Sequence, residues 1–350
     1  MNRIIIIISL IMTMITTTTS AAVKASYDIV PLPASVSMQK GEPFMLSSAT
    51  RIIYTGSDEA MKRNAKFLAD YLAQTTGIRL STNTASGKAQ KNAITLCTDS
   101  KMGEEAYRIS VDKKGIVITG GSAKGVFYGI QTLRKSVPVG EQTDCIELSP
   151  VRIADQPRFG YRGMMLDCSR HFFSVDFIKK YLDLMAMHNM NVFHWHLTDD
   201  QGWRIEIKKY PRLTSIGSKR SGTIVGFNSM VDDQREYGGF YTQDQAREIV
   251  EYARQRYITI IPEIDMPGHM KAALAAYPEL GCTGGPYDVG HRWGIYLDVL
   301  CLGNEKIYAF CEDVLKELSD IFPSEFVHIG GDETPTERWA ECPKCQAVAK

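Results

Sequence analysis

The 350-residue chain has no excess of charge of either sign, because 40 lysine and arginine residues balance 40 aspartate and glutamate residues. A surface without net positive charge gives no support to a nucleic-acid partner or to an anionic membrane surface. After its first residues the sequence also has no long apolar run, so we expect no stable membrane anchor. The expected partners are therefore neither nucleic acids nor membranes.

Metal-binding motifs are sparse as well. Eight cysteines are present, but residues 342–345 form the only C-x-x-C motif, and a zinc site there would need further ligands. We expect a local disulfide or two free thiols in this motif, and a disulfide between Cys282 and Cys301, which bracket one loop. Cys168 and Cys311 lie on apolar faces and are expected in the core. We expect neither a metal nor a cofactor.

The one long apolar run of the sequence lies at the N-terminus. Arg3 precedes a mostly apolar run at residues 4–15, which is followed by threonines and by small residues up to Ala22. This order is typical of a secretory signal peptide, and the run is short for a membrane-spanning helix. We expect residues 1–22 to be a signal peptide and the protein to be periplasmic or extracellular. An uncleaved membrane anchor is the alternative.

Residues 23–150 predict a small α+β domain. It contains no cluster of residue types suited to catalysis, so we expect a non-catalytic supporting domain. A break between Pro150 and Pro157 predicts the linker. The expected elements are strands at 51–54 and 93–97, a hairpin of 107–111 with 116–119, and helices at 57–75 and 123–134.

Residues 151–350 show a different pattern, in which strand and helix alternate strictly. Such alternation predicts parallel β/α units with functional residues at the carboxyl ends of the strands. The apolar segment 326–329 is expected to be a buried strand. The expected strands are 162–167, 191–197, 257–264 and 326–329, and the helices are 174–188, 242–256 and 304–320.

Polar side chains follow each of the four predicted strands. The last strand ends in two glycines and the acids Asp332 and Glu333, which suit acid–base chemistry but also occur as helix caps. Four successive strand ends that deliver an acid, a base or a cation to one rim favour a site. The companions are Arg170 after the first strand, Asp199 after the second and His269 after the third.

The rim combines paired carboxylates with histidine, arginine and aromatic residues, which indicates sugar chemistry. Arg170 can hold sugar hydroxyls with its planar fork of donors, or it can form a salt bridge to a neighbouring carboxylate. His269 can connect Asp199 to a catalytic acid and tune its pKa, or it can be a hydrogen-bonded structural histidine. Supporting roles, without direct catalysis, are expected for Asp200, Glu263 and Asp265.

Four motifs, in the order in which they occur along the chain, resemble those of the β-N-acetylhexosaminidases of glycoside hydrolase family 20. The N-terminal domain also resembles that family's non-catalytic α+β domain, so the likeness covers nearly the whole mature chain. The motifs are Asp167-Cys168-Ser169-Arg170-His171, the stretch from His194 to Trp203, Pro262-Glu263-Ile264-Asp265-Met266-Pro267-Gly268-His269 and His328-Ile329-Gly330-Gly331-Asp332-Glu333.

The resemblance implies a retaining exo-β-N-acetylhexosaminidase that removes terminal N-acetylglucosamine or N-acetylgalactosamine by substrate-assisted catalysis. It implies that Glu333 is the general acid and then the base. Asp332 would hold the acetamide nitrogen while the acetamide oxygen attacks the anomeric carbon. Arg170 would bind hydroxyls of the terminal sugar, and Asp199 and His269 would form a relay to Glu333.

The family's catalytic domain is a (β/α)8 barrel, and such a barrel takes about 250 residues. Residues 151–350 show only about the first four β/α units, so we expect little activity unless another chain or a C-terminal half completes the barrel. Two alternatives remain open. One is a non-catalytic glycan-binding or truncated remnant. The other is a metal-dependent TIM-barrel hydrolase that uses His194, His196, His269 and Asp332.

Overall fold

The computed structural model describes residues 22–56, 58–85, 90–140, 142–227 and 229–350, and it divides the chain into two compact units. The predicted signal peptide, except for Ala22, lies outside the described residues. The first unit ends at Asp155 and the second begins at Gln156. None of the helices in the described residues is both long and apolar enough to cross a membrane.

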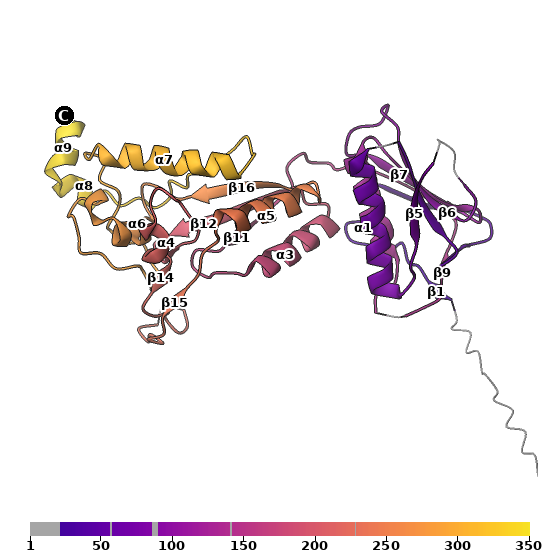
Figure 1. Cartoon of the computed structure of the whole chain (residues 1–350), viewed down its shortest axis with the longest axis horizontal. Helices are drawn as coiled ribbons and strands as arrows, with labels where there is room; N and C mark the ends of the chain where they lie inside the picture. Colours follow the sequence, from indigo (N-terminus) through magenta and orange to yellow (C-terminus); the bar gives the residue numbers. More distant parts are fainter. Residues whose placement is uncertain (1–21, 57, 86–89, 141, 228) are drawn as a thin grey trace, which may run out of the picture. The chain divides into compact units, whose positions relative to one another are not determined.

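The first unit contains a seven-stranded mixed sheet whose strands contact two helices, α1 (Glu59–Thr76), which is labelled in Figure 1, and α2 (Ala123–Ser136). A second sheet has the order β1 (Val23–Lys24), β9 (Cys145–Leu148) and β3 (Phe44–Ser47). The large sheet has the order β2 (Ser35–Met38), β10 (Val151–Asp155), β7 (Tyr107–Asp112), β8 (Gly115–Gly120), β6 (Ala93–Thr98), β4 (Arg51–Thr55) and β5 (Ser81–Ala85).

Local signals in the sequence explain the boundaries of the helices in this unit. Asp58 and Ser122 cap the N-termini of α1 and α2 with their side-chain oxygens. Gly77 ends α1 in the left-handed conformation, with φ of 82°. Strands β7 and β8 form the expected antiparallel hairpin.

The predicted domain boundary is several residues too early. Residues 151–155, which we assigned to the second domain, form β10 and pair with both β2 and β7. Val151 and Ile153 are buried while the alternate residues are exposed, which is the pattern of a strand with one buried face. The two prolines that flank this strand misled the linker prediction.

The second unit is built on parallel strands β11 (Gly163–Asp167), β12 (Val192–Asp199) and β16 (Thr259–Ile264). Figure 1 shows α3 (Val175–Met187), α5 (Gln243–Arg254) and α7 (Lys306–Ile321) alongside these strands. Ser174 caps α3, and a capping box of Thr242 and Gln245 opens α5. The pairing of β12 with β16 shifts register between His196 and Thr198, as at a β-bulge.

Short elements fill the long connections of this unit. They supply the loops that surround the carboxyl ends of the strands. These elements are β13 (Gly202–Trp203), α4 (Arg212–Ser215), β14 (Lys219–Arg220), β15 (Tyr237–Gly238), α6 (Lys271–Ala276), a 3-10 turn (Pro278–Leu280), α8 (Glu337–Glu341) and α9 (Pro343–Ala349).

The prediction that the strand at 326–329 is buried is wrong. Phe326 is 65% exposed and Ile329 is 51% exposed. The segment runs beside β16, where His328 forms a parallel bridge with Glu263 and its backbone bonds with Pro262 and Ile264. Within the described part of the chain, its other edge pairs with no strand. The apolar side chains are exposed because a neighbour is present on one side only.

Candidate active site

The carboxyl ends of the strands bring four of the predicted residues together, and three of them, Arg170, His269 and Glu333, line one cavity. Arg170 follows β11, Asp199 ends β12, His269 follows β16, and Glu333 follows the 326–329 segment. The cavity has a volume of about 350 Å³, which is within the range of small-molecule sites. Its lining includes Arg170, His171, Gln201, Arg220, His269, Trp293 and Glu333.

Asp199 is the buried anion at the base of this site. Its Oδ2 lies 2.9 Å from His196 Nε2 and 2.7 Å from Arg170 Nη2, and its Oδ1 lies 3.2 Å from His269 Nδ1. Burial opposes the charge, but the hydrogen bonds from the two histidines and the charge of Arg170 outweigh it. The pKa of Asp199 is lowered to about 2, so this carboxylate stays ionised at neutral pH.

His269 connects the buried acids to the exposed ones. Its Nδ1 lies 3.1 Å from Asp200 Oδ2 as well as near Asp199. Hydrogen bonds to Asp199 and Asp200 raise the pKa of His269 to about 11 against the effect of burial. Its Nε2 lies 3.6 Å from Glu333 Oε2 and 3.8 Å from Asp332 Oδ2. Among the described residues this buried nitrogen has no hydrogen-bond partner, so it can still donate toward the acid pair.

The Asp332–Glu333 loop has a backbone that requires glycine. Gly330 and Gly331 have φ of 62° and 94°, and a Cβ on Gly330 would lie 1.9 Å from Asp265 Oδ1. Asp265 Oδ1 also accepts a hydrogen bond from the amide of Gly331 at 3.1 Å. Glu333 itself has φ of 38°, a region that non-glycine residues rarely occupy. Asp265 therefore holds the loop that presents the two acids.

Arg170 lies on the cavity wall with every side-chain nitrogen in contact with a partner. Nη1 lies 2.9 Å from Asp167 Oδ2, Nη2 lies 2.7 Å from Asp199 Oδ2, and Nε donates to Gln201 Oε1 at 2.9 Å. The alternative that we kept open, a salt bridge to a neighbouring carboxylate, is therefore present. Because the guanidinium also lines the cavity, the salt bridges fix its orientation toward any ligand there.

Comparisons with known proteins identify the family of this chain. Residues 159–350 match Glycosyl hydrolase family 20, catalytic domain, and residues 26–156 match Glycosyl hydrolase family 20, domain 2. The chain belongs to glycosyl hydrolase family 20. Its catalytic unit is accordingly of the TIM-barrel fold and follows an α+β domain, as the motifs predict.

Relatives within family 20 are similar over most of this chain. A Beta-hexosaminidase of Porphyromonas gingivalis is 45% identical over 91% of this chain and 40% of its own length. A Beta-N-acetylhexosaminidase of Cellulomonas fimi is 36% identical over 88% of this chain and 60% of its own length. The GH20 beta-N-acetylhexosaminidase structure from Streptomyces coelicolor has a TM-score of 0.78 and 37% identity, covering 91% of this chain and 62% of that one. This chain therefore spans about half the length of the relatives it matches.

The metal site that we considered as an alternative is not assembled. His194 Nε2 and His196 Nδ1 lie 2.5 and 2.7 Å from Glu263 Oε2, and His328 Nδ1 lies 3.0 Å from Glu263 Oε1. These contacts outweigh the effect of burial and lower the pKa of Glu263. No group of potential ligands in the described residues places His194 or His196 with both His269 and Asp332. In this family 20 chain, those histidines instead join strand ends through Glu263.

The structure also adds cavity residues that the sequence analysis missed. Gln201 and Arg220 are held at the cavity by Arg170. Gln201 accepts a hydrogen bond from Arg170 Nε, and Arg220 Nη1 donates to the backbone oxygen of Arg170. Trp293 lines the cavity from the long loop after α6 and is 63% exposed. A tryptophan next to glycine in a connecting loop was a usable signal for an aromatic side chain on the cavity wall.

Replacing Asp265 with asparagine should change how stability depends on pH. Burial raises the pKa of Asp265 from 3.8 to about 7. The folded chain thus binds the proton more tightly than the unfolded chain, and the wild type loses stability as pH rises from about 4 to about 7. The asparagine side chain does not titrate and can still accept a hydrogen bond from the amide of Gly331. The free energy of unfolding of D265N relative to wild type should therefore increase across that window and level off above it.

Denaturant titrations between pH 4 and pH 8 measure this difference. Asp320→Asn, at an exposed position near the end of α7, provides the matched control. A D265N difference that does not change with pH would show that Asp265 titrates in the folded chain as an ordinary surface acid.

Proposed function

We propose that this chain carries the acid–base half of a retaining exo-β-N-acetylhexosaminidase that acts by substrate-assisted catalysis. The observation that carries the proposal is the contact line from Asp199 through His269 to Asp332 and Glu333, at the wall of a cavity that Arg170 also lines. Relatives named as beta-hexosaminidases, and a Vibrio harveyi exo beta-N-acetylglucosaminidase solved with N-acetylglucosamine, support the same substrate class.

The position of the acid pair favours a nucleophile supplied by the substrate. Retaining enzymes with two catalytic carboxylates place them about 5–5.5 Å apart, on opposite sides of the reacting carbon. Asp332 and Glu333 are neighbours in the chain, and both approach the same nitrogen of His269, so we place both on the same side of the reacting carbon. We assign Glu333 as the proton donor to the leaving oxygen. Asp332 accepts from the acetamide N–H while the acetamide oxygen attacks the anomeric carbon and forms an oxazolinium ion.

His269 contributes through its charge and its position. With a pKa near 11 it is an imidazolium over the neutral pH range, and buried Asp199 holds it in place from the opposite side. Its Nε2, which lies 3.6 Å from Glu333 Oε2, can donate a hydrogen bond toward that side chain once Glu333 has given up its proton. The same Glu333 can then act as the base that activates water in the second step.

We also propose that further polypeptide covers the open sides of the catalytic sheet. Met164 and Met165 of β11 and Phe326 and Ile329 beside β16 are all exposed. Each edge strand has a paired neighbour on one side only within the described residues, and open apolar edges tend to associate. The cover would be a complementing chain or the segment that matches the remaining length of the relatives.

A two-arm assay tests the proposed function. The 350-residue chain is incubated with 4-nitrophenyl N-acetyl-β-glucosaminide, alone and with the part of the Porphyromonas gingivalis relative that lies beyond the aligned region. We expect turnover in the completed arm, and none with the corresponding β-glucoside because it lacks the acetamide. Calorimetric binding of N-acetylglucosamine without turnover in both arms would support the non-catalytic glycan-binding alternative. If the chain shows no binding and no turnover in either arm, both the enzymatic proposal and the glycan-binding alternative are overturned.

Removing the Arg170 side chain should weaken substrate binding more than the chemical step. In Arg170→Ala the sugar hydroxyls lose a charged donor fork, and we expect KM to rise by about 10-fold or more with kcat within a few-fold. The melting temperature should also fall because Asp199 loses a partner while buried. Arg254→Ala on α5, where the arginine pairs only with exposed Glu251 in the contacts described, is the control. Unchanged KM in R170A would refute the binding role.

Export is a further proposal, supported by the order of charged, apolar and small residues in the first 22 positions. Expression of the chain with its native N-terminus in a Gram-negative host tests it. We expect the protein in the periplasm or medium and a new N-terminus close to Val23. A cell-bound chain that retains its first residues would instead indicate an uncleaved anchor.

A further inference from the structure

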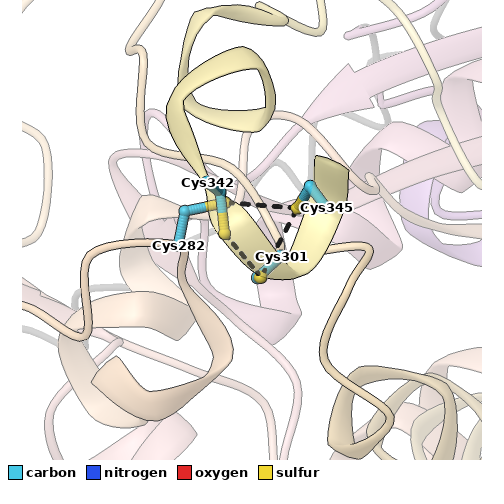
Figure 2. A group of neighbouring side chains, drawn as sticks. All are labelled: Cys282, Cys301, Cys342 and Cys345. Carbon is cyan, nitrogen blue, oxygen red and sulfur yellow. Dashed lines mark hydrogen bonds between the residues drawn. The ribbon is translucent and has the colours of Figure 1, made fainter. Parts of the chain in front are cut away.

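Four cysteines from two distant parts of the second unit meet at one point. Cys282 and Cys301 lie in the loop region between α6 and α7, while Cys342 lies between α8 and α9 and Cys345 lies within α9. Figure 2 shows their sulfur atoms directed toward one another. All eight cysteines belong to the described residues and none is paired in a disulfide. Our expectation of separate pairs thus missed that the two pairs form one cluster.

Three of the six separations between the sulfur atoms match the edges of a tetrahedral metal site. Cys301 Sγ lies 3.6 Å from Cys345 Sγ and 3.7 Å from Cys342 Sγ, and Cys282 Sγ lies 3.8 Å from Cys345 Sγ. Four sulfurs at about 2.3 Å from a central zinc would be separated by about 3.8 Å along each tetrahedral edge. A disulfide would instead require one sulfur pair at about 2.05 Å. The ligand atoms of all four cysteines lie within 4.8 Å of one another.

The surroundings of the cluster are also those of bound thiolates. Cys301, Cys342 and Cys345 are buried, and Trp339 packs against them. The amide of Gly303 donates to Cys345 Sγ at 3.4 Å. Backbone donors of this kind offset the negative charge of metal-bound sulfur and fix its orientation. A closed shell of four cysteines leaves no position for substrate, which is the arrangement of structural zinc.

We propose that Cys282, Cys301, Cys342 and Cys345 bind one structural Zn²⁺ ion, a site separate from the catalytic cavity. This proposal revises our expectation that the chain binds no metal. The ion would join the loop that carries Trp293 to the helices that follow Glu333. Its binding would therefore stabilise the two segments that flank the catalytic cavity without taking part in the reaction.

Backbone contacts already hold the loop that carries Trp293 against α8 and α9, as a metal ion shared by these segments would require. Gly281 and Leu300 form an antiparallel bridge that places Cys282 beside Cys301. Trp339 Nε1 donates to the backbone oxygen of Leu300 at 2.8 Å, so α8 already contacts the loop. Gly303 lies so close to α9 that a Cβ there would be 2.2 Å from the Lys344 carbonyl carbon.

Metal content and thiol state of the full chain, purified without chelator or reductant, test the proposal. We expect one zinc per chain by plasma mass spectrometry and no disulfide among these four cysteines by alkylation and peptide mapping. Replacement of the zinc by Co²⁺ should give the visible absorption bands of tetrahedral thiolate coordination. Removal of the metal should lower the melting temperature by more than about 5 °C, and added Zn²⁺ should restore it.

Matched variants separate one shared site from two independent cysteine pairs. Cys282→Ser/Cys301→Ser and Cys342→Ser/Cys345→Ser should each lose all bound zinc. Cys97→Ser should keep one zinc per chain, because Cys97 is not one of the four proposed ligands. Its sulfur contacts Thr119 Oγ1, so a serine hydroxyl suits that position. Two disulfides in the wild-type chain, or four free thiols that take up neither Zn²⁺ nor Co²⁺, would overturn the proposal even if the variants fail to fold.

Discussion

Replacing Glu333 with glutamine is expected to lower kcat/KM for N-acetylglucosamine disaccharides by about 10²–10⁴-fold, the usual contribution of a general acid. Glutamine keeps the size of the side chain and can still contact His269, but it has no proton to give to the leaving oxygen. The loss should be smaller for 4-nitrophenyl glycosides, because nitrophenolate leaves without needing a proton. The ratio of the two losses therefore reports the acid role itself.

The control for this measurement lies in the same segment. Glu337→Gln changes an acid in the first turn of α8, four residues further on, and should leave both rates within a few-fold. Both variants are compared in whichever arm of the two-arm assay gives turnover. If E333Q hydrolyses the disaccharide as fast as wild type does, Glu333 is not the acid.

Replacing Asp332 with asparagine should lower kcat by about 10²–10³-fold with little change in KM, the size of effect seen when one group that stabilises developing charge is lost. Asparagine can still accept a hydrogen bond from the acetamide N–H. It cannot balance the positive charge that develops as the acetamide oxygen attacks. Asp320→Asn again serves as the control and should keep the wild-type kcat.

Two further measurements make the Asp332 assignment specific. Fluorine atoms on the acetyl group make its oxygen a weaker nucleophile, so the wild-type kcat should fall with each added fluorine. A kcat independent of fluorination would rule out attack by the substrate's own acetamide. Asp332 also raises the pKa of Asp265 through its charge, after the larger effect of burial. In D332N, the pH window of the Asp265 stability effect should therefore move downward.

Much of the second unit could be predicted because its signals are local. The alternation of apolar strands and capped helices located β11, β12, β16 and their helices within a few residues. The same alternation brings strand ends to one rim, which explains why Arg170, Asp199, His269 and Glu333 do lie together. Local signals failed for β10. The two flanking prolines indicated a linker, and the alternation of buried and exposed residues over only five positions was too short to outweigh them.

The features that could not be predicted depend on contacts between distant segments. Burial of 326–329 depends on which neighbours flank it, and its apolar composition says nothing about that. The two cysteine pairs look independent in the sequence because some 40 residues separate Cys301 from Cys342. Trp293 lies in a connection without periodicity, so its place on the cavity wall follows from how the loop folds back. The contact of His269 with both Asp199 and Asp200 likewise requires the observed backbone geometry.

The register shift in β12 has a consequence for any attempt to transfer this site to another barrel. In an unbroken strand, residues three apart point to opposite faces. Here His196 Nε2 nevertheless lies 2.9 Å from Asp199 Oδ2 across the shifted position. A graft that copies the residues of β12 but restores regular pairing would turn one of the two side chains away. A designer must therefore copy the register shift between His196 and Thr198 together with the side chains of His196 and Asp199.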